Sequence, residues 1–236
     1  MVLMLNLLLG HLLGDFLLQP GWMVAAKRRG LPGLMTHTGA VALCTGLVLI
    51  ADLPWLAAMV LLAGASHLAV EVITITARRN LSLSGASLFV ADQALHFASL
   101  GAIALLAGPN IHGLAVTTFG VPLPPSTLAL IDGILIVTLL GSILVFEIDV
   151  AAGFERRQIL PYDGPRVFGM AERAASLVAA VALHPALALV PFVPGALSAR
   201  ALDDAARARR LLDLKTGVAL SAAAYCFIIA VGALSR

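Results

Sequence analysis

The chain has 236 residues, of which 60% are hydrophobic and only 12% are charged, and its mean hydropathy is +0.99. Soluble domains are about half apolar and a quarter charged, so this composition excludes an ordinary soluble protein and predicts a polytopic membrane protein. The length leaves room for about seven or eight spans of ~20 residues, but not for a separate soluble domain. The net charge of +2 does not indicate a nucleic-acid partner, because the basic residues mostly fall in loops where membrane topology explains them.

Eight apolar runs are expected to form the helices of an all-α, polytopic transmembrane bundle. The run 187–199 is short and holds Pro191 and Pro194, so it is expected either to span as a broken helix or to re-enter the membrane. The runs are 2–19, 31–51, 54–77, 85–107, 127–149, 167–184, 187–199 and 212–234.

Basic residues occupy every second connection between these runs. Clusters such as Lys27–Arg29 and Arg78–Arg79 follow the first and third runs, whereas the connections at 108–126 and 185–186 contain no Lys or Arg. The positive-inside rule produces this alternation, so the basic loops are predicted to face the cytoplasm and both termini to face outward.

Seven ionisable side chains lie inside the first four apolar runs. Such groups are costly in a bilayer unless they face a protein interior, where they usually have a function. Two pairs are spaced His-x3-acid and a third has the reverse order, so each pair shares one face of a helix. In the predicted topology all seven fall in the cytoplasmic half of the membrane. They are His11, Asp15, His37, His67, Glu71, Asp92 and His96.

Imidazole and carboxylate groups together are suitable ligands for a divalent transition metal such as zinc, manganese or iron. We expect His37 to act as a further ligand or as an oxyanion partner, and Glu71 or Asp92 to act as a general base or a second metal ligand. The sequence leaves open whether one or two ions bind. The main expected ligands are His11, Asp15, His67 and His96.

These residues occur in a series of short motifs along the chain. The series is His11-Leu-Leu-Gly-Asp15-Phe-Leu-Leu-Gln19-Pro-Gly-Trp22, then Lys27, His37, His67-x3-Glu71 and Asp92-Gln93-x2-His96. Over residues 6–97 it resembles an uncharacterised bacterial integral membrane family, domain of unknown function 3307. Glu71 stands where that family usually has Asp, which lengthens the side chain by one methylene group and keeps the carboxylate. The resemblance implies a bacterial inner-membrane protein, and it brings no established reaction.

The chain is therefore expected to consist of two parts. Residues 1–108 would form a four-helix membrane unit with the His/Asp/Glu site, and residues 109–236 would add accessory membrane helices with cytoplasmic basic loops. In the second part, Glu172 and Arg173 are expected to neutralise each other or a loop carboxylate.

A metal site at this depth, next to the basic cluster Lys27–Arg29, favours one enzymatic function. Such a cluster attracts anionic head groups, so we expect a metal-dependent hydrolase that acts on a lipid-linked or membrane-associated phosphate or ester. Its partners would be membrane lipids and no nucleic acid. Two alternatives stay open: a non-catalytic scaffold or assembly subunit, and a metal- or proton-coupled transporter, which would show charges in both membrane halves and internal repeats.

Overall fold

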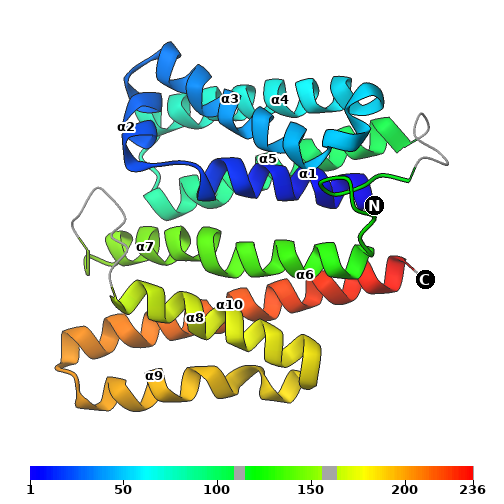
Figure 1. Cartoon of the computed structure of the whole chain (residues 1–236). Coiled ribbons are helices and arrows are strands. Elements are labelled where there is room, and N and C mark those ends of the chain that lie inside the picture. The colour runs from blue at the N-terminus through cyan, green and yellow to red at the C-terminus, as the bar shows by residue number, and fades with distance from the viewer. Residues whose placement is uncertain (109–114, 156–163, 236) are drawn as a thin grey trace. The chain divides into compact units, whose positions relative to one another are not determined.

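The computed structural model describes residues 1–108, 115–155 and 164–235, and it is almost entirely helical (Figure 1). Its contacts divide it into unit 1, Met1–Asp132 with Ser235, and unit 2, Gly133–Leu234. The described part of unit 1 contains α1 (Val2–Leu12), η1 (Leu13–Leu17), α2 (Gly21–Arg29), α3 (Leu31–Val48), η2 (Ile50–Asp52), α4 (Leu53–Asn80), α5 (Gly85–Ala107) and most of α6 (Pro125–Leu135). The described part of unit 2 contains η4 (Ile136–Leu140), α7 (Gly141–Ala151), α8 (Gly164–Val178), η5 (Ala179–Leu183), η6 (Pro185–Phe192), α9 (Val193–Ser198), η7 (Ala199–Ala201) and α10 (Asp204–Leu234). The expected all-α fold is confirmed.

Each of the eight apolar runs is helical, but the expected count of seven or eight spans is not confirmed. Five helices in the described ranges are long and apolar enough to cross a membrane, and the bent pair formed by Val2–Leu17 and Gly21–Arg29 makes a sixth if it counts as one span. The run 187–199 lies in the shorter helical stretch Pro185–Ala201, where prolines interrupt the hydrogen bonding and give 3-10 turns around a short α9. The run 167–184 does not qualify either, because charged side chains lie within α8.

The first helix pair is bent by 94° between Leu17 and Gly21. Pro20 causes the break, because proline disfavours helical backbone in the residue before it and has no amide hydrogen to continue the helix. After the break, α2 packs against α3 so closely that a Cβ on Gly33 would lie 2.2 Å from the Ala26 carbonyl oxygen. This contact directs the basic end of α2 back towards the bundle.

Two glycines let α1 and η1 approach α3 at backbone distance. A Cβ on Gly10 would lie 2.5 Å from the Thr45 Cα, and one on Gly14 would lie 2.5 Å from the Val41 Cα. A pair of small residues four apart is a common way for membrane helices to pack closely, because no hydrophobic effect drives their association in lipid. The histidine and the aspartate that directly follow these glycines are thereby held against α3.

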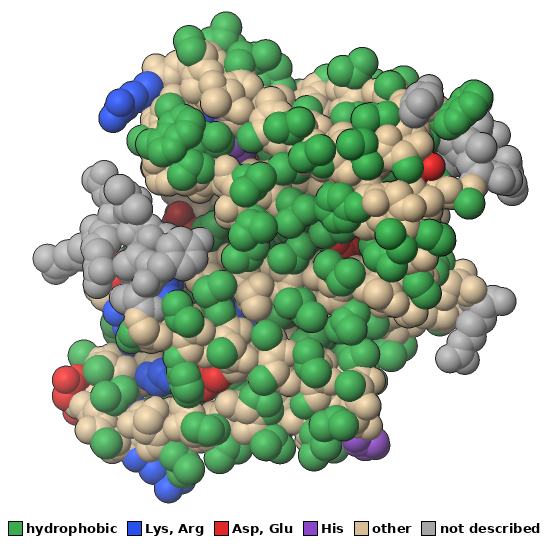
Figure 2. All heavy atoms as spheres, viewed as in Figure 1, with side chains coloured by type: hydrophobic (Ala, Val, Ile, Leu, Met, Phe, Trp, Pro, Cys, Tyr) green, Lys and Arg blue, Asp and Glu red, His purple; other side chains and the backbone are tan. Residues whose placement is uncertain are grey.

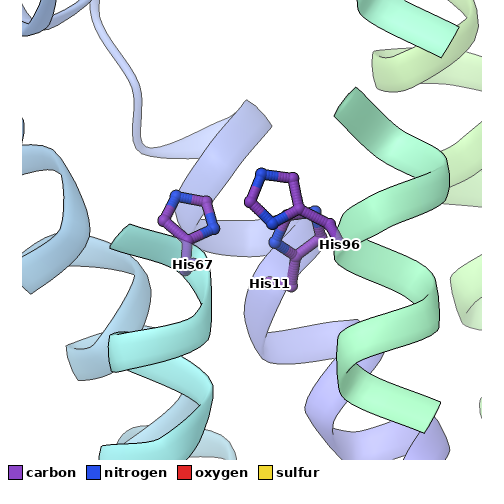
Figure 3. A group of neighbouring side chains, drawn as sticks. All are labelled: His11, His67 and His96. Atoms are coloured by element: carbon purple, nitrogen blue, oxygen red, sulfur yellow. The ribbon is translucent and has the colours of Figure 1, made fainter. Parts of the chain in front are cut away.

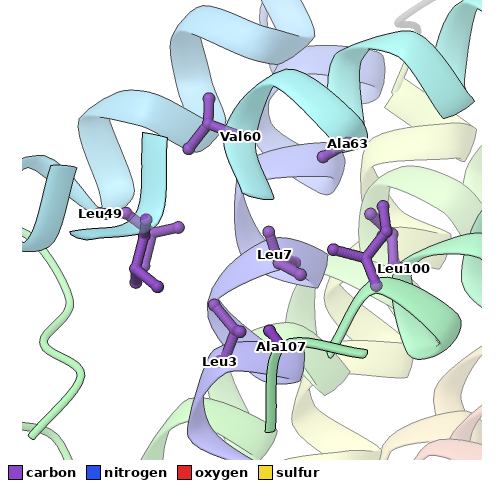
Figure 4. Packing of buried hydrophobic residues seen from close by; sticks show 9 residues of the cluster. Leu3, Leu7, Leu49, Val60, Ala63, Leu100 and Ala107 are labelled. Carbon is purple, nitrogen blue, oxygen red and sulfur yellow. The ribbon is translucent and has the colours of Figure 1, made fainter. Parts of the chain in front are cut away.

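The apolar core of unit 1 fills one half of its four-helix bundle (Figure 4). It joins the beginning of α1, the end of α3, the beginning of α4 and the end of α5, and the His/Asp/Glu residues lie outside it, towards the other end of the bundle. The core comprises Leu3, Leu7, Leu49, Leu56, Val60, Ala63, Leu100, Ile103 and Ala107.

Helix α8 of unit 2 has the reverse of the pattern found in soluble proteins. Its charged residues, including Arg166 and Arg173, are buried, whereas Val167, Phe168 and Val178 are exposed. Hydrophobic side chains also cover much of the surface seen in Figure 2. A helix that is polar inside and apolar outside is suited to lipid on its outer face, which agrees with the membrane character of the chain.

Candidate metal centre

The seven ionisable residues predicted from sequence converge within unit 1. The site residues come from four helices: His11 and Asp15 from the end of α1 and the π-helical turn η1, His37 from α3, His67 and Glu71 from α4, and Asp92 and His96 from α5. Six of the seven are buried and only Asp92 is partly exposed. Four helices therefore bring together, in the half of the bundle not filled by the apolar core, residues that are up to 85 positions apart in sequence, from His11 to His96.

Three histidines form the first possible metal-binding group (Figure 3). The ring centroids of His67 and His96 lie 4.3 Å apart, those of His11 and His96 lie 4.7 Å apart, and those of His11 and His67 lie 5.4 Å apart. One nitrogen from each ring lies within 4.8 Å of the other two. Three histidines are a sufficient protein ligand set for a catalytic zinc ion, because a fourth position then stays open for water or substrate.

Two ring nitrogens of this group have no hydrogen-bond partner in the described part of the chain. They are Nδ1 of His67 and Nε2 of His96, and both are buried. A buried polar atom without a partner costs about 1–3 kcal/mol, so native structures contain few of them. A metal ion would give these nitrogens the partner that the protein does not provide.

A second group consists of Asp15, His37, His67 and Glu71. Nε2 of His37 lies 3.2 Å from Oδ1 of Asp15, 3.1 Å from Oε1 of Glu71 and 3.0 Å from Nε2 of His67. Ligands at ~2.0–2.1 Å around a tetrahedral zinc ion are roughly 3.3 Å from one another. These separations are thus close to those of a tetrahedral site, and the 4.0 Å between His67 Nε2 and Glu71 Oε1 is somewhat longer.

His67 belongs to both groups, so the two are not independent. A neutral imidazole has one protonated nitrogen and one nitrogen with a free lone pair, and only the second can bind a metal. His67 can therefore serve one ion at a time while it stays neutral. The geometry favours one ion per chain over two.

Amide side chains hold the ligands in place. Gln93 contacts His11 at 3.3 Å and donates to Asp15 at 3.4 Å and to Asp92 at 2.9 Å. Gln19 donates to Asp15 at 3.2 Å and contacts Nδ1 of His37 at 2.9 Å. Such outer hydrogen bonds orient metal ligands and commonly contribute 10–100-fold in metal affinity. The sequence showed both glutamines beside candidate ligands, but it assigned them no role.

Lys27 completes the cluster from α2. Its Nζ lies 2.5 Å from Oε1 of Glu71, and its side chain is only 15% exposed. From the sequence, Lys27 was expected to follow membrane topology and to attract lipid head groups. Its ion pair with Glu71 on α4 was not predicted. With neutral imidazoles, the three carboxylates of Asp15, Glu71 and Asp92 and the one ammonium group give a net charge of −2. A divalent cation would balance this charge.

A model of the protein family of unknown function DUF3307 matches residues 3–120, which is half of the chain. The chain belongs to this family. All seven site residues lie inside the part that matches the DUF3307 model, so the site is contained in the family's own domain. Comparison with curated proteins and with solved structures gave no match.

Proposed function

We propose that unit 1 binds one divalent transition-metal ion, zinc, manganese or iron, and uses it to hydrolyse a lipid-linked or membrane-associated phosphate or ester. The main support for a bound metal is that three histidines from three helices meet. Two of them have buried ring nitrogens without a hydrogen-bond partner among the described residues. Nitrogen and carboxylate ligands suit these three ions, and the net charge of the cluster suits a divalent one.

Hydrolysis is the reaction that these ligands and acids suit best. A bound ion of this kind lowers the pKa of a coordinated water from 15.7 to about 7, which supplies hydroxide at neutral pH. Asp92 is the most exposed of the three acids, with 13% of its side chain accessible, and it accepts a hydrogen bond from Thr74 at 2.7 Å. It is thus placed to accept a proton from water, while Glu71 serves as a ligand or as a second base.

Lys27 supports a phosphate or ester as the substrate. Its ammonium group contacts Glu71 at the edge of the cluster, where a substrate oxygen carrying negative charge would meet it. The neighbouring Arg28 and Arg29 are exposed and extend the positive charge along α2. An anionic substrate would therefore be attracted on the side where α2 covers the site.

The proposal places the site in the cytoplasmic half of a bacterial inner membrane, with both termini outside. Its support is the alternation of basic and neutral connections in the sequence. Reporter fusions after residues 30 and 80 should be active as cytoplasmic fusions, and one after residue 115 as an external fusion. The reverse pattern would move the site to the outer half.

A non-catalytic scaffold is the second candidate, and one observation favours it. His37 has contacts to Asp15, Glu71 and Gln19, so part of the cluster is satisfied by hydrogen bonds without an ion. Interactions of this kind between membrane helices are worth about 1 kcal/mol each. A transporter is less well supported, because the His/Asp/Glu residues gather towards one end of the bundle whereas an apolar core packs the other end.

Metal content tests the proposal directly. The protein purified in detergent should carry about one zinc, manganese or iron ion per chain, measured by elemental analysis. His67→Ala removes the residue common to both groups and should reduce the content below about a tenth of that value, because every ligand set loses a member. His184→Ala is the matched control, since His184 is exposed and lies in unit 2. A wild-type protein with no metal, whose melting temperature is unchanged by chelator, would support the scaffold instead.

Hydrolysis needs its own measurement. The metal-loaded protein should release phosphate or alcohol from a panel of lipid phosphates and esters in mixed micelles. Asp92→Asn and Glu71→Gln should slow the reaction by about 10²–10⁴-fold if either acid acts as the general base. Bound metal without any turnover on the panel would leave metal binding in place and remove the hydrolase.

A further inference from the structure

Unit 2 contains a cavity of about 220 Å³ that the metal centre does not use. Residues of α7, α8, η6 and α10 line it, all of them within Gly133–Leu234, and its described lining lies outside the residues that match the family model. The charged lining residues are Arg166, Arg173, Arg209, Arg210, Glu172 and Asp213. Two further acids, Asp149 and Glu155, contact these arginines from outside the lining, so the case for an anion rests on the arginine that none of the four acids pairs with directly.

Arg173 is the most informative of these residues. Its side chain is buried, with the residue only 4% exposed, and its Nε donates a hydrogen bond to the Val137 carbonyl oxygen at 2.5 Å. Within the described residues no carboxylate lies within 4 Å of this guanidinium group, although Asp213 and Glu172 attract it from farther away. The expected pairing of Glu172 with Arg173 is therefore not found, because Glu172 pairs with Arg210. A buried charge without a direct counter-ion is costly, so an anion in the cavity would be stabilised here.

The other arginines are held in place around the cavity by acids. Arg210 donates to both carboxylate oxygens of Glu172, at 2.6 and 2.7 Å. Arg209 contacts Asp149 at 3.0 Å and Glu155 at 3.6 Å, and Asp149 also lies 3.7 Å from Arg166. A guanidinium group has about five N–H donors in a rigid plane, so an arginine that binds one carboxylate keeps donors for a second anion. The acids thus orient the arginines without using all their donors.

The position of the cavity favours a phosphate group as the ligand. The cavity lies between the first half of α7, the beginning of α8 and the beginning of α10. Charged side chains gather near the beginning of α8 and α10 in Figure 2. On α8, Val167 and Phe168 are 52% and 48% exposed, so an apolar surface directly adjoins the arginines. Basic pockets between membrane helices on the cytoplasmic side bind the head groups of anionic lipids.

The size of the cavity limits the ligand further. Its volume of about 220 Å³ is below the ~300–1,000 Å³ typical of sites for drug-sized molecules. A headgroup phosphate fits this volume if its acyl chains stay outside in the lipid. Arginine's planar donors match the oxygens of phosphate in pairs, which adds specificity to the charge attraction.

We propose that this arginine-lined cavity of unit 2 binds the phosphate group of an anionic lipid. The site is separate from the metal centre and does not depend on the hydrolase. Inorganic phosphate has the same phosphate chemistry, and competition between it and a lipid probe distinguishes the two sources.

Binding is measured by calorimetry on the full chain purified in a neutral detergent. The probes are dihexanoyl phosphatidic acid, dihexanoyl phosphatidylcholine with the same acyl chains and a neutral head group, and inorganic phosphate. Phosphatidic acid should bind at least tenfold more tightly than phosphatidylcholine. Displacement of phosphatidic acid by millimolar inorganic phosphate would show that the phosphate group alone is recognised, and no displacement would show that the whole lipid is needed; both results support the site.

Variants locate the binding in the cavity. Arg173→Gln removes the unpaired charge, and Ala206→Leu fills the cavity while keeping every charge; each should weaken phosphatidic acid binding at least tenfold. Ala206→Leu keeps the test decisive if Arg173→Gln does not fold. Arg200→Gln removes one exposed charge outside the cavity lining and should bind as the wild type does. Equal binding of the two lipids, or wild-type binding by Ala206→Leu, would overturn the proposal and leave the arginines as a structural ion-pair network.

Discussion

Both units of the chain bury ionisable side chains among apolar helices, but they bury opposite chemistry. Unit 1 gathers imidazoles and carboxylates with a single lysine, which gives an excess of negative charge and of nitrogen lone pairs. Unit 2 gathers guanidinium groups, of which Arg209 and Arg210 are paired with acids and Arg173 is not. The first arrangement is suited to a cation and the second to an anion.

The comparison shows that buried charge alone does not tell what a membrane site binds. Arginine cannot lose its proton and cannot ligate a metal, whereas neutral histidine can accept a metal at its free nitrogen. The ligand therefore depends on which buried groups lack a partner: cationic donors favour an anion, and nitrogen or oxygen lone pairs favour a cation. In unit 1 the atoms without hydrogen-bond partners in the described residues include nitrogens of His67 and His96. In unit 2 the buried guanidinium group of Arg173 has no carboxylate within 4 Å among the described residues.

The largest expected effect on stability is in unit 2. Glu172→Ala leaves Arg210 without its carboxylate, and breaking one partner of a buried ion pair costs about 3–5 kcal/mol of unfolding free energy. The measurement is unfolding of the detergent-solubilised protein by denaturant. Asp204→Ala is the control, because the pair that Asp204 forms with Arg207 is exposed, and no measurable change is expected. Equal effects of the two substitutions would contradict the distinction between the buried and the exposed pair.

The second largest expected effect is on the stability that a bound metal ion gives to unit 1. An ion at a hundredfold excess over its Kd stabilises the native state by about 2.7 kcal/mol, and His67→Ala should abolish this gain because both ligand groups need His67. Thermal unfolding with chelator and with added zinc, manganese or iron measures the difference. Glu172→Ala should keep the metal-dependent gain despite its lower stability. Loss of the gain in Glu172→Ala would indicate that the two clusters are not separate.

Helix packing in unit 1 gives a smaller effect. Gly14→Ala places a methyl group against the Val41 backbone, which should cost about 1–3 kcal/mol and weaken metal binding, because the next residue is Asp15. Gly39→Ala is a matched control, since nothing lies within 4 Å of its Cβ position and alanine favours the helix. Both stability and metal affinity should be measured. A Gly14→Ala protein that is as stable as the control would show that α1 and α3 are less closely packed.

The smallest expected effect concerns Lys27. Its ammonium group contacts Glu71, so it competes with a cation for this carboxylate, and Lys27→Met should tighten metal binding by about tenfold, or roughly 1.4 kcal/mol. Arg28→Met removes an exposed charge from the same helix and should change the affinity much less. Competition with a chromogenic chelator measures both. Weaker binding in Lys27→Met would mean that the lysine organises the site instead of competing for it.

Much of unit 1 could be predicted from the sequence. The apolar runs predicted the helices because a bilayer requires backbone groups to bond within each segment, and the His-x3-acid spacing predicted pairs on one helix face because of the helical period. The expected span count is not confirmed for two runs, since the number of apolar residues does not show that prolines divide 187–199 or that α8 buries its charges.

The sequence by itself determined the class of the protein, the positions of its helices and the seven residues that could form a site. Only the tertiary structure decided that His67 lies in both ligand groups, that Lys27 contacts Glu71 and that Glu172 pairs with Arg210. These contacts join different helices, and they depend on the bend at Pro20 and on packing at glycines, which set distances that no local pattern encodes. Local periodicity shows which face of a helix a residue occupies, and only packing shows which residue it meets there.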